Sequence, residues 1–134
     1  MSIELKPVIL GAKCKIYALQ TCGDKCLTED FLAEQRTAMS AEVDKLMRLL
    51  QYTAQNGPLR NEEKCKPLGN DIYEFKTTNL RLAWFWDAGY VIVCLHGWVK
   101  KSQKTPPGEI DRAVIARTKY FEAKRKNQVL ILTQ

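Results

Sequence analysis

The 134-residue sequence has no apolar run that approaches the roughly 18–20 residues of a membrane-spanning helix. Its first residues, MSIELKPVIL, also lack the basic start, long apolar stretch and small-residue cleavage site of a secretory signal. We therefore expect a cytoplasmic protein with no membrane partner. Repeats, low-complexity tracts and long linkers are absent as well, so the length fits one domain over residues 1–134.

Cysteine occurs five times, and an odd number without a secretory signal argues against a disulfide framework. Cys14 and Cys94 are expected to pack as small apolar side chains. Cys22 and Cys26 could supply two zinc ligands, but the chain offers no second pair, and a structural zinc site needs four ligands. We therefore expect neither a metal nor another cofactor, and the purpose of Cys22 and Cys26 stays open.

Histidine occurs once in the sequence, at position 96. Acidic residues are scarce in the segment that follows it. Between Trp98 and Lys126, nine basic residues accompany three acidic ones. The rest of the chain is balanced, so this segment holds the whole net charge of +6. Such a concentration attracts phosphate backbones without reading their sequence. The alternative is a solvated helix with a basic last turn.

Hydrophobic periodicity predicts the coarse order β, α, α, β, β, β, α, in which the first β comprises two short extended segments, with a β-like tail after Asn127. Gly57 should end the second helix and Gly89 should form a hairpin turn, both with positive φ. The residues between Leu59 and Asn70 read as irregular. The expected elements are strands at Pro7–Leu10 and Cys14–Gln20, helices capped by Thr28 and Ser40, strands at Ile72–Lys76, Arg81–Trp86 and Tyr90–Val99, and a helix after Pro106-Pro107.

This order predicts an α+β domain. Short connections force antiparallel pairing, so the sheet should be small and mostly antiparallel. We expect the helices to cover one face of the sheet, which leaves the other face for a ligand or partner.

The element order and several motifs together resemble the RelE/ParE superfamily of bacterial toxins, and most closely its HigB-type, phage-derived branch. The lysine-rich string after a strand that ends in His-Gly is the most specific motif. The resemblance covers about residues 14–126. It is carried by Asn56-Gly57, by Lys66-Pro67-Leu68-Gly69 before Ile72–Lys76, by Arg81 at a strand start, by Cys94–Trp98 followed by KKSQKTP, and by Ala113, Arg117 and Tyr120 in the last helix.

The resemblance implies a small antiparallel sheet with two N-terminal helices packed on one face. It also implies a ribosome-dependent mRNA endonuclease that a cognate antitoxin holds inactive. The implied partners are therefore mRNA, the ribosome and an antitoxin, which we expect to be a helix-turn-helix protein. Basic strand positions of the family contact phosphate and match Lys76 and Arg81 here, while the family's basic stretch after the last strand matches Lys100, Lys101 and Lys104. Tyr120 lies in the C-terminal region, where members often carry a functional aromatic residue or histidine. The RNA-binding candidates are Lys76, Lys104, Arg117 and Tyr120.

Metal-independent RNA cleavage uses the ribose 2′-hydroxyl as the nucleophile on the adjacent phosphate. Arg81 suits phosphate because its planar fork can hold two oxygens, while lysines supply point charges. His96 can exchange a proton near neutral pH, since an ordinary histidine has a pKa of about 6.5. The catalytic candidates are Arg81, His96, Lys100 and Lys101.

Each candidate has a structural alternative. Arg81 could pair with Glu74 across the hairpin, and His96, for which no orienting carboxylate is identifiable, could be a satisfied core residue. Tyr120 could belong to the core. The alternative functions are a gyrase-inhibiting toxin of the ParE type and a non-catalytic nucleic-acid-binding regulatory module.

Overall fold

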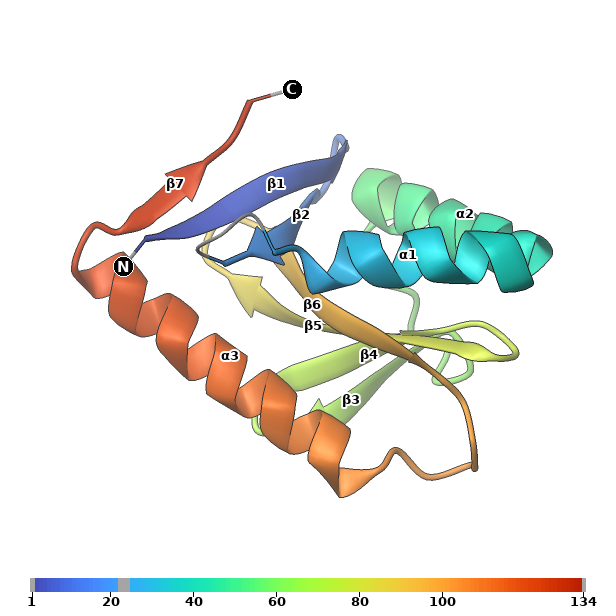
Figure 1. The fold of residues 1–134 in the computed structure, drawn as a ribbon. Helices are drawn as coiled ribbons and strands as arrows, with labels where there is room; N and C mark the ends of the chain where they lie inside the picture. The colour runs from blue at the N-terminus through green and yellow to red at the C-terminus, as the bar shows by residue number, and fades with distance from the viewer. Residues whose placement is uncertain (1, 22–24, 134) are drawn as a thin grey trace.

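The computed structural model describes residues 2–21 and 25–133, and within these ranges the chain forms an α+β fold (Figure 1). Its helices are α1 (Leu27–Ala38), α2 (Ser40–Asn56) and α3 (Pro107–Arg125). Its strands are β1 (Ile3–Leu10), β2 (Lys15–Gln20), β3 (Cys65–Gly69), β4 (Ile72–Lys76), β5 (Leu80–Asp87), β6 (Val91–Val99) and β7 (Val129–Ile131).

The strands form a seven-stranded sheet in the order β3-β4-β5-β6-β2-β1-β7. The meander from β3 to β6 is antiparallel, as its short connections require. In contrast, β2 pairs with β6 in parallel, and β7 pairs with β1 in parallel. The sheet is therefore mixed and larger than the small antiparallel sheet that we expected, because the strands that precede the helices join the same sheet.

Two strand boundaries differ from the sequence-based expectation. β1 begins at Ile3 rather than at Pro7, and β3 lies in a segment that was expected to be irregular. β3 is an edge strand with a register shift between Pro67 and Gly69. Proline is tolerated at a sheet edge because no neighbouring strand needs its missing amide, so this strand carries little β signal in its sequence.

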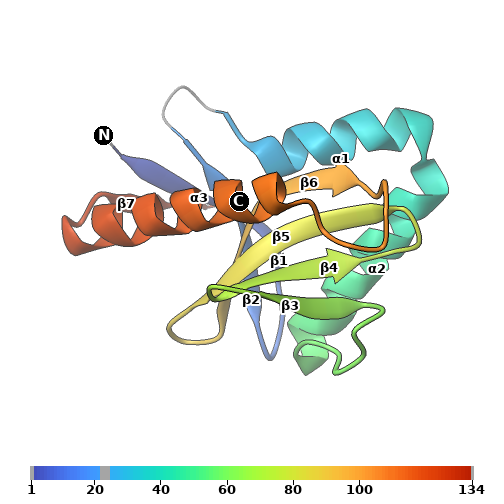
Figure 2. The ribbon, with the colours of Figure 1, turned by 90° about the horizontal axis from the view of Figure 1, so that it is seen from below.

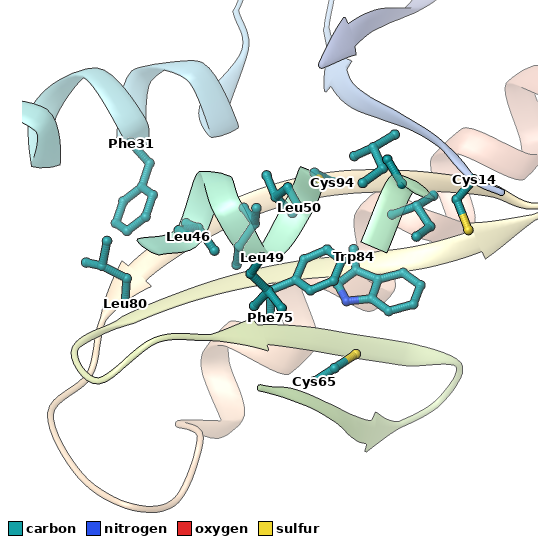
Figure 3. Close-up of a cluster of buried hydrophobic side chains, with 14 of the residues drawn as sticks. Cys14, Phe31, Leu46, Leu49, Leu50, Cys65, Phe75, Leu80, Trp84 and Cys94 are labelled. Atoms are coloured by element: carbon teal, nitrogen blue, oxygen red, sulfur yellow. The ribbon is translucent and has the colours of Figure 1, made fainter. Parts of the chain in front are cut away.

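One side of the sheet packs against α1 and α2. Figure 3 shows this core, where Leu46, Leu49 and Leu50 of α2 lie over Phe75 and Trp84 of the sheet. The apolar side of α2 thus forms part of the core. A close approach of α1 to β6 needs a glycine, because a Cβ at Gly97 would lie 2.3 Å from the Phe31 ring.

The opposite side of the sheet carries α3, so the expectation of a fully open second face is wrong. Ala113 and Tyr120 of α3 are buried against Phe85 and Val93 in a second core cluster. Figure 1 shows α3 on the other side of the strands from α1 and α2, and Figure 2 shows α3 from below. The site described below lies on the part of this face next to the first turn of α3.

The chain reverses direction where sequence predicted glycine turns. Gly57 follows α2 with φ 88°, and Gly89 lies between β5 and β6 with φ 81°. The expected caps differ, because α1 begins at Leu27 and buries Thr28, while Ser40 is itself the first residue of α2. Among the described residues, no helix has both the length and the apolar character of a membrane span.

The cysteines of the described ranges are free thiols buried in the fold: Cys14, Cys26, Cys65 and Cys94. The predicted apolar packing of Cys14 and Cys94 is confirmed by exposed fractions of 1% and 0%. Burial raises the pKa of the Cys65 thiol to about 11, so this thiol is protonated at neutral pH. Cys22 lies outside the described residues.

Candidate functional site

Two neighbouring rows of side chains, most of them polar, lie on the face of the sheet that carries α3. In the first row, Lys76 of β4 lies opposite Arg81 of β5, which lies opposite Trp98 of β6. In the second row, Glu74 lies opposite Ala83, which lies opposite His96. Residues two apart on a strand point to the same face. The register therefore brings strand residues that are far apart in sequence into one patch.

A β-bulge decides which face His96 occupies. Ala83 pairs with His96 and Trp84 pairs with Cys94, which leaves Leu95 as the extra residue on β6. A bulge interrupts the alternation of a strand and redirects the side chains beyond it. Leu95 packs into the core beneath α3, and His96, which pairs with Ala83 on the same side, faces α3 as well. Without this bulge, His96 would point toward α1.

Four basic side chains gather at the end of this patch, and we refer to them as the cation cluster: Lys66, Lys76, Arg81 and Lys100. Burial lowers the pKa of Lys76, and the positive charges of Arg81, Lys66 and Lys100 lower it further, while Glu74 partly opposes them. Among the described residues, no ion pair within 4.0 Å involves any of these four. Like charges held together with no close ion pair favour the binding of an anion.

Arg81 is the buried member of the cation cluster, with 6% of its surface exposed. Its Nη1 donates hydrogen bonds to the carbonyl oxygens of Thr77 at 2.6 Å and Leu80 at 2.9 Å. The guanidinium therefore braces the turn between β4 and β5, and it forms no close ion pair with Glu74. The same turn is tied to α2, because Glu42 Oε1 accepts hydrogen bonds from Thr77 Oγ1 at 2.8 Å and from the Asn79 amide at 2.7 Å.

The segment that links β6 to α3 crosses the second row of polar side chains. Thr105 Oγ1 donates a hydrogen bond of 3.0 Å to Glu74 Oε1, and Glu109 Oε1 lies 3.1 Å from His96 Nε2. At the start of this segment, the Lys100 amide donates to the carbonyl oxygen of Asn79 at 2.7 Å. These contacts fix the basic segment against the turn between β4 and β5, and they place Lys100 beside Lys76.

Glu109 is the orienting carboxylate for His96 that sequence inspection did not find. It lies in the first turn of α3, where the helix dipole already favours an acidic residue. Its contact with His96 therefore leaves no separate signal in the sequence. Arg112 Nη1 lies 3.2 Å from the same Glu109 oxygen. The His96 side chain is 5% exposed and that of Glu109 is 22% exposed. Glu109 is therefore the member of the pair that solvent and a ligand can reach.

Burial sets the protonation state of His96. It lowers the pKa of the imidazole, the positive charge of Arg112 lowers it further, and Glu109 opposes both. His96 is accordingly neutral at pH 7. Since a carboxylate only accepts hydrogen bonds, we assign the hydrogen to Nε2, which donates to Glu109.

The stability of the protein should fall as the pH is lowered from 7 to 5.5. The folded-state pKa of His96 lies below the ordinary value of about 6.5, so the unfolded chain binds the proton more tightly. The free energy of unfolding should then decrease by at most about 1.4 kcal/mol per pH unit below pH 6.5. Urea unfolding at several pH values measures this slope.

His96→Gln is the matched control for the pH experiment, because the chain has no other histidine and this variant should remove most of the slope. Stability that rises as the pH falls would show that Glu109 holds the imidazolium form, and the assignment of a neutral His96 would then be wrong.

A hollow of about 630 Å³ lies at the free edge of β6, between α1 and the start of α3. Glu109, Trp98 and Lys101 line it, together with Phe31 and Gln35 of α1. The hollow exists because β2 pairs with β6 only from Val91 to Cys94, which leaves the second half of β6 without a neighbour on that side. Lys101 and Glu109 both line this hollow, while Lys100 belongs to the cation cluster.

The remaining candidates lie elsewhere. Lys104 is exposed in the segment after β6. Arg117 lies against the Phe121 ring, 4.8 Å from its centroid, and 3.8 Å from Asp71. The Tyr120 hydroxyl is 2.6 Å from Asp87 at the far end of β5, which is about 20 Å from Arg81 for a strand rise of about 3.3 Å per residue. Arg117 and Tyr120 thus take part in the packing of α3.

Over the described ranges, no three His, Cys, Asp or Glu side chains gather as ligands for a metal ion. The patch and hollow hold the cation cluster, the Glu109–His96 pair and Lys101. Together these groups can bind an anion and exchange a proton.

Comparison with known proteins identifies the family. No curated protein matches the chain. The model of the family described as phage-derived protein Gp49-like (DUF891) matches residues 32–119, about two thirds of the chain. This match spans the strands of the meander, the whole cation cluster and Glu109, while the narrower HigB-type assignment stays a prediction. The chain belongs to the phage-derived Gp49-like family, which is part of the RelE/ParE-like toxin superfamily.

Proposed function

We propose that this protein is the toxin of a type II toxin–antitoxin pair and that it inhibits translation by cleaving mRNA, with the ribosome presenting the substrate. The family membership supports the toxin role. The observation that carries the nuclease role is the proximity of the cation cluster to the Glu109–His96 pair on one face of the sheet. The cluster makes no close ion pair with any residue that the structure describes. Phosphate binding and proton transfer are the two requirements of RNA cleavage, and this face supplies groups for both.

Glu109 is the proposed general base. Its carboxylate is partly exposed at the hollow and takes the proton of the ribose 2′-hydroxyl, whose oxygen then attacks the adjacent phosphorus. His96 is a positioning residue in this scheme, because it is buried and donates its Nε2 hydrogen to Glu109. Arg112 on the exposed side contacts the same oxygen and limits the rotation of the carboxylate.

The cation cluster is the proposed phosphate site. Lys76 and Lys100 are half-buried and supply positive charge for the oxygens that become more negative as the 2′-oxygen attacks. Arg81 acts from beneath, since it is held by backbone carbonyl oxygens and contributes its charge to the surface above. Lys101, which shares the hollow with Glu109, is the proposed donor of the proton that the departing 5′-oxygen takes up.

Removing the two accessible lysines tests the phosphate site. Expression of the wild-type protein should arrest growth and produce new mRNA 5′ ends, which end mapping detects. Lys76→Ala with Lys100→Ala should lower the cleavage rate by about 10²-fold or more, because two cations no longer stabilise the phosphate. Lys45→Ala with Arg48→Ala removes the same charge from α2, where both residues are exposed, and should cleave at the wild-type rate.

The same experiment separates the alternative functions. Cuts at defined positions in mRNA that disappear in the Lys76/Lys100 variant support the nuclease. Growth arrest with DNA damage and intact mRNA would instead favour a gyrase inhibitor, and salt-sensitive RNA binding without cuts would favour a regulatory module. Full cleavage by the folded Lys76/Lys100 variant would reject the cation cluster as the phosphate site.

A further inference from the structure

α3 carries apolar side chains on two of its sides. Ala113, Tyr120 and Ala123 are buried against the sheet, but Ile115 is 56% exposed. Residues three and four apart on a helix share a face. Ile115 therefore belongs to an outer stripe of α3 that does not serve the core, and this stripe consists of Arg112, Ile115, Lys119, Glu122 and Lys126.

This outer stripe forms one wall of a groove of about 720 Å³, which we call the α3 groove. The opposite wall is formed by Ile3 at the start of β1 and Leu19 at the end of β2. The helix ends beside the start of β1 (Figure 1), where the Ile3 amide donates to the Gln128 carbonyl oxygen at 2.8 Å. From residue 112 to residue 126 the wall is about 21 Å long, the length of about four helical turns.

The α3 groove has an apolar floor and a basic rim. Ile3, Leu19 and Ile115 supply apolar surface, while Lys119 and Lys126 supply positive charge. Among the described residues, neither Lys119 nor Lys126 makes an ion pair within 4.0 Å. A groove with this distribution is complementary to a helix that has an apolar stripe flanked by acidic residues.

We propose that the α3 groove binds an acidic amphipathic helix of a partner protein. An RNA strand fits less well, because no aromatic ring is among the residues that line the groove, so none can stack on bases. The proposal goes beyond RNA cleavage and does not depend on it, since the cation cluster, His96 and Glu109 take no part in the groove.

A synthetic peptide of about four helical turns tests the proposal, with leucine at helical spacing and glutamate on either side of the leucine stripe. Fluorescence anisotropy of the labelled peptide with the full-length protein should show saturable binding. A scrambled peptide of the same composition should bind at least about tenfold more weakly, because it presents no continuous apolar stripe.

Variants of the groove locate the binding site. Ile115→Asp should weaken binding of the peptide by about tenfold or more, and Lys119→Glu with Lys126→Glu should do the same through charge. These side chains are not part of the core, so circular dichroism should show a folded protein. Lys45→Glu with Arg48→Glu changes the charge of α2 equally and should leave binding unchanged.

Three outcomes would overturn the proposal. They are no binding of the amphipathic peptide, equal binding of the scrambled peptide, and unchanged binding by Ile115→Asp. If a single-stranded RNA oligonucleotide bound the wild type and lost binding in the Lys119/Lys126 variant while the peptide did not, the groove would be an RNA surface instead. Growth arrest by Ile115→Asp reports separately on the proposed nuclease, because Ile115 lies outside that site.

Discussion

Glu109→Gln is expected to lower RNA cleavage by about 10²–10⁴-fold, the usual contribution of a general base. Glutamine has the same shape and still offers an oxygen to His96 Nε2 and Arg112 Nη1, which lie 3.1 and 3.2 Å from Glu109 Oε1. It cannot accept the proton of the 2′-hydroxyl. The variant should therefore remain folded and bind RNA while losing turnover, which single-turnover cleavage of a reporter mRNA in a translation extract measures.

A role in catalysis and a role in structure give different results for Glu109→Gln. Asp111→Asn is the matched control, since it removes one exposed carboxylate near the start of the same helix and should cleave at the wild-type rate. Wild-type cleavage by Glu109→Gln would exclude Glu109 as the base.

Asp87→Ala is expected to destabilise the protein by about 2–3 kcal/mol, the cost of leaving buried polar groups without partners. The Asp87 side chain is 7% exposed and accepts hydrogen bonds from Tyr120 Oη at 2.6 Å and Lys124 Nζ at 2.7 Å. Most of the cost comes from the Tyr120 hydroxyl, because that residue is 2% exposed. Lys124 is 46% exposed and can turn to water, so its ion pair contributes little.

Urea unfolding measures this loss, and a double-mutant cycle assigns it. Asp87→Ala with Tyr120→Phe should recover part of the stability, because the double variant has no buried hydroxyl without an acceptor. Asp44→Ala is the control: its ion pair with Arg36 is half exposed, and the change should stay within about 0.5 kcal/mol. If the double variant were as unstable as the sum of the single ones, the hydrogen bond would not be the cause.

Asp87 should also contribute to the acid sensitivity of the protein. Burial alone would raise its pKa, but the hydrogen bonds from Lys124, Tyr120 and the Ala88 amide outweigh burial and lower the pKa. A carboxylate whose folded-state pKa is lowered stabilises the protein above its ordinary pKa of about 3.9, and this contribution disappears as the pH falls further. The His96 contribution is also lost as the pH falls, but its loss begins below about pH 6.5, well above the range in which Asp87 is protonated. The two residues can therefore be separated by titration.

Much of the fold could be predicted because its signals are local. The apolar stripe of α2, the turn at Gly89 and the strands on either side of that turn each depend on residues close together in sequence. β3 could not be predicted, because its proline and glycine suppress the β signal, and its strand character comes from pairing with β4. The parallel pairing of β2 with β6 was equally inaccessible, since it joins segments about 75 residues apart.

The candidate site divides in the same way. The basic segment after β6, the single histidine and the positions of Lys76 and Arg81 were readable from sequence, as was the family resemblance. Glu109 was missed because its first-turn position already had an explanation in the helix dipole. Its contact with His96 depends on the path of the segment that links β6 to α3, and no local pattern encodes that path.

By itself, the amino-acid sequence determined the α+β class, the concentration of positive charge and the residue types from which a phosphate site can be built. Composition and short-range periodicity are properties of neighbouring residues, and they survive in any arrangement of the elements. Only the tertiary structure decided which cations share a surface, that Arg81 lies beneath it and that His96 faces Glu109. These relations depend on strand register and on one bulge in β6, where a shift of a single residue exchanges the two faces of the sheet.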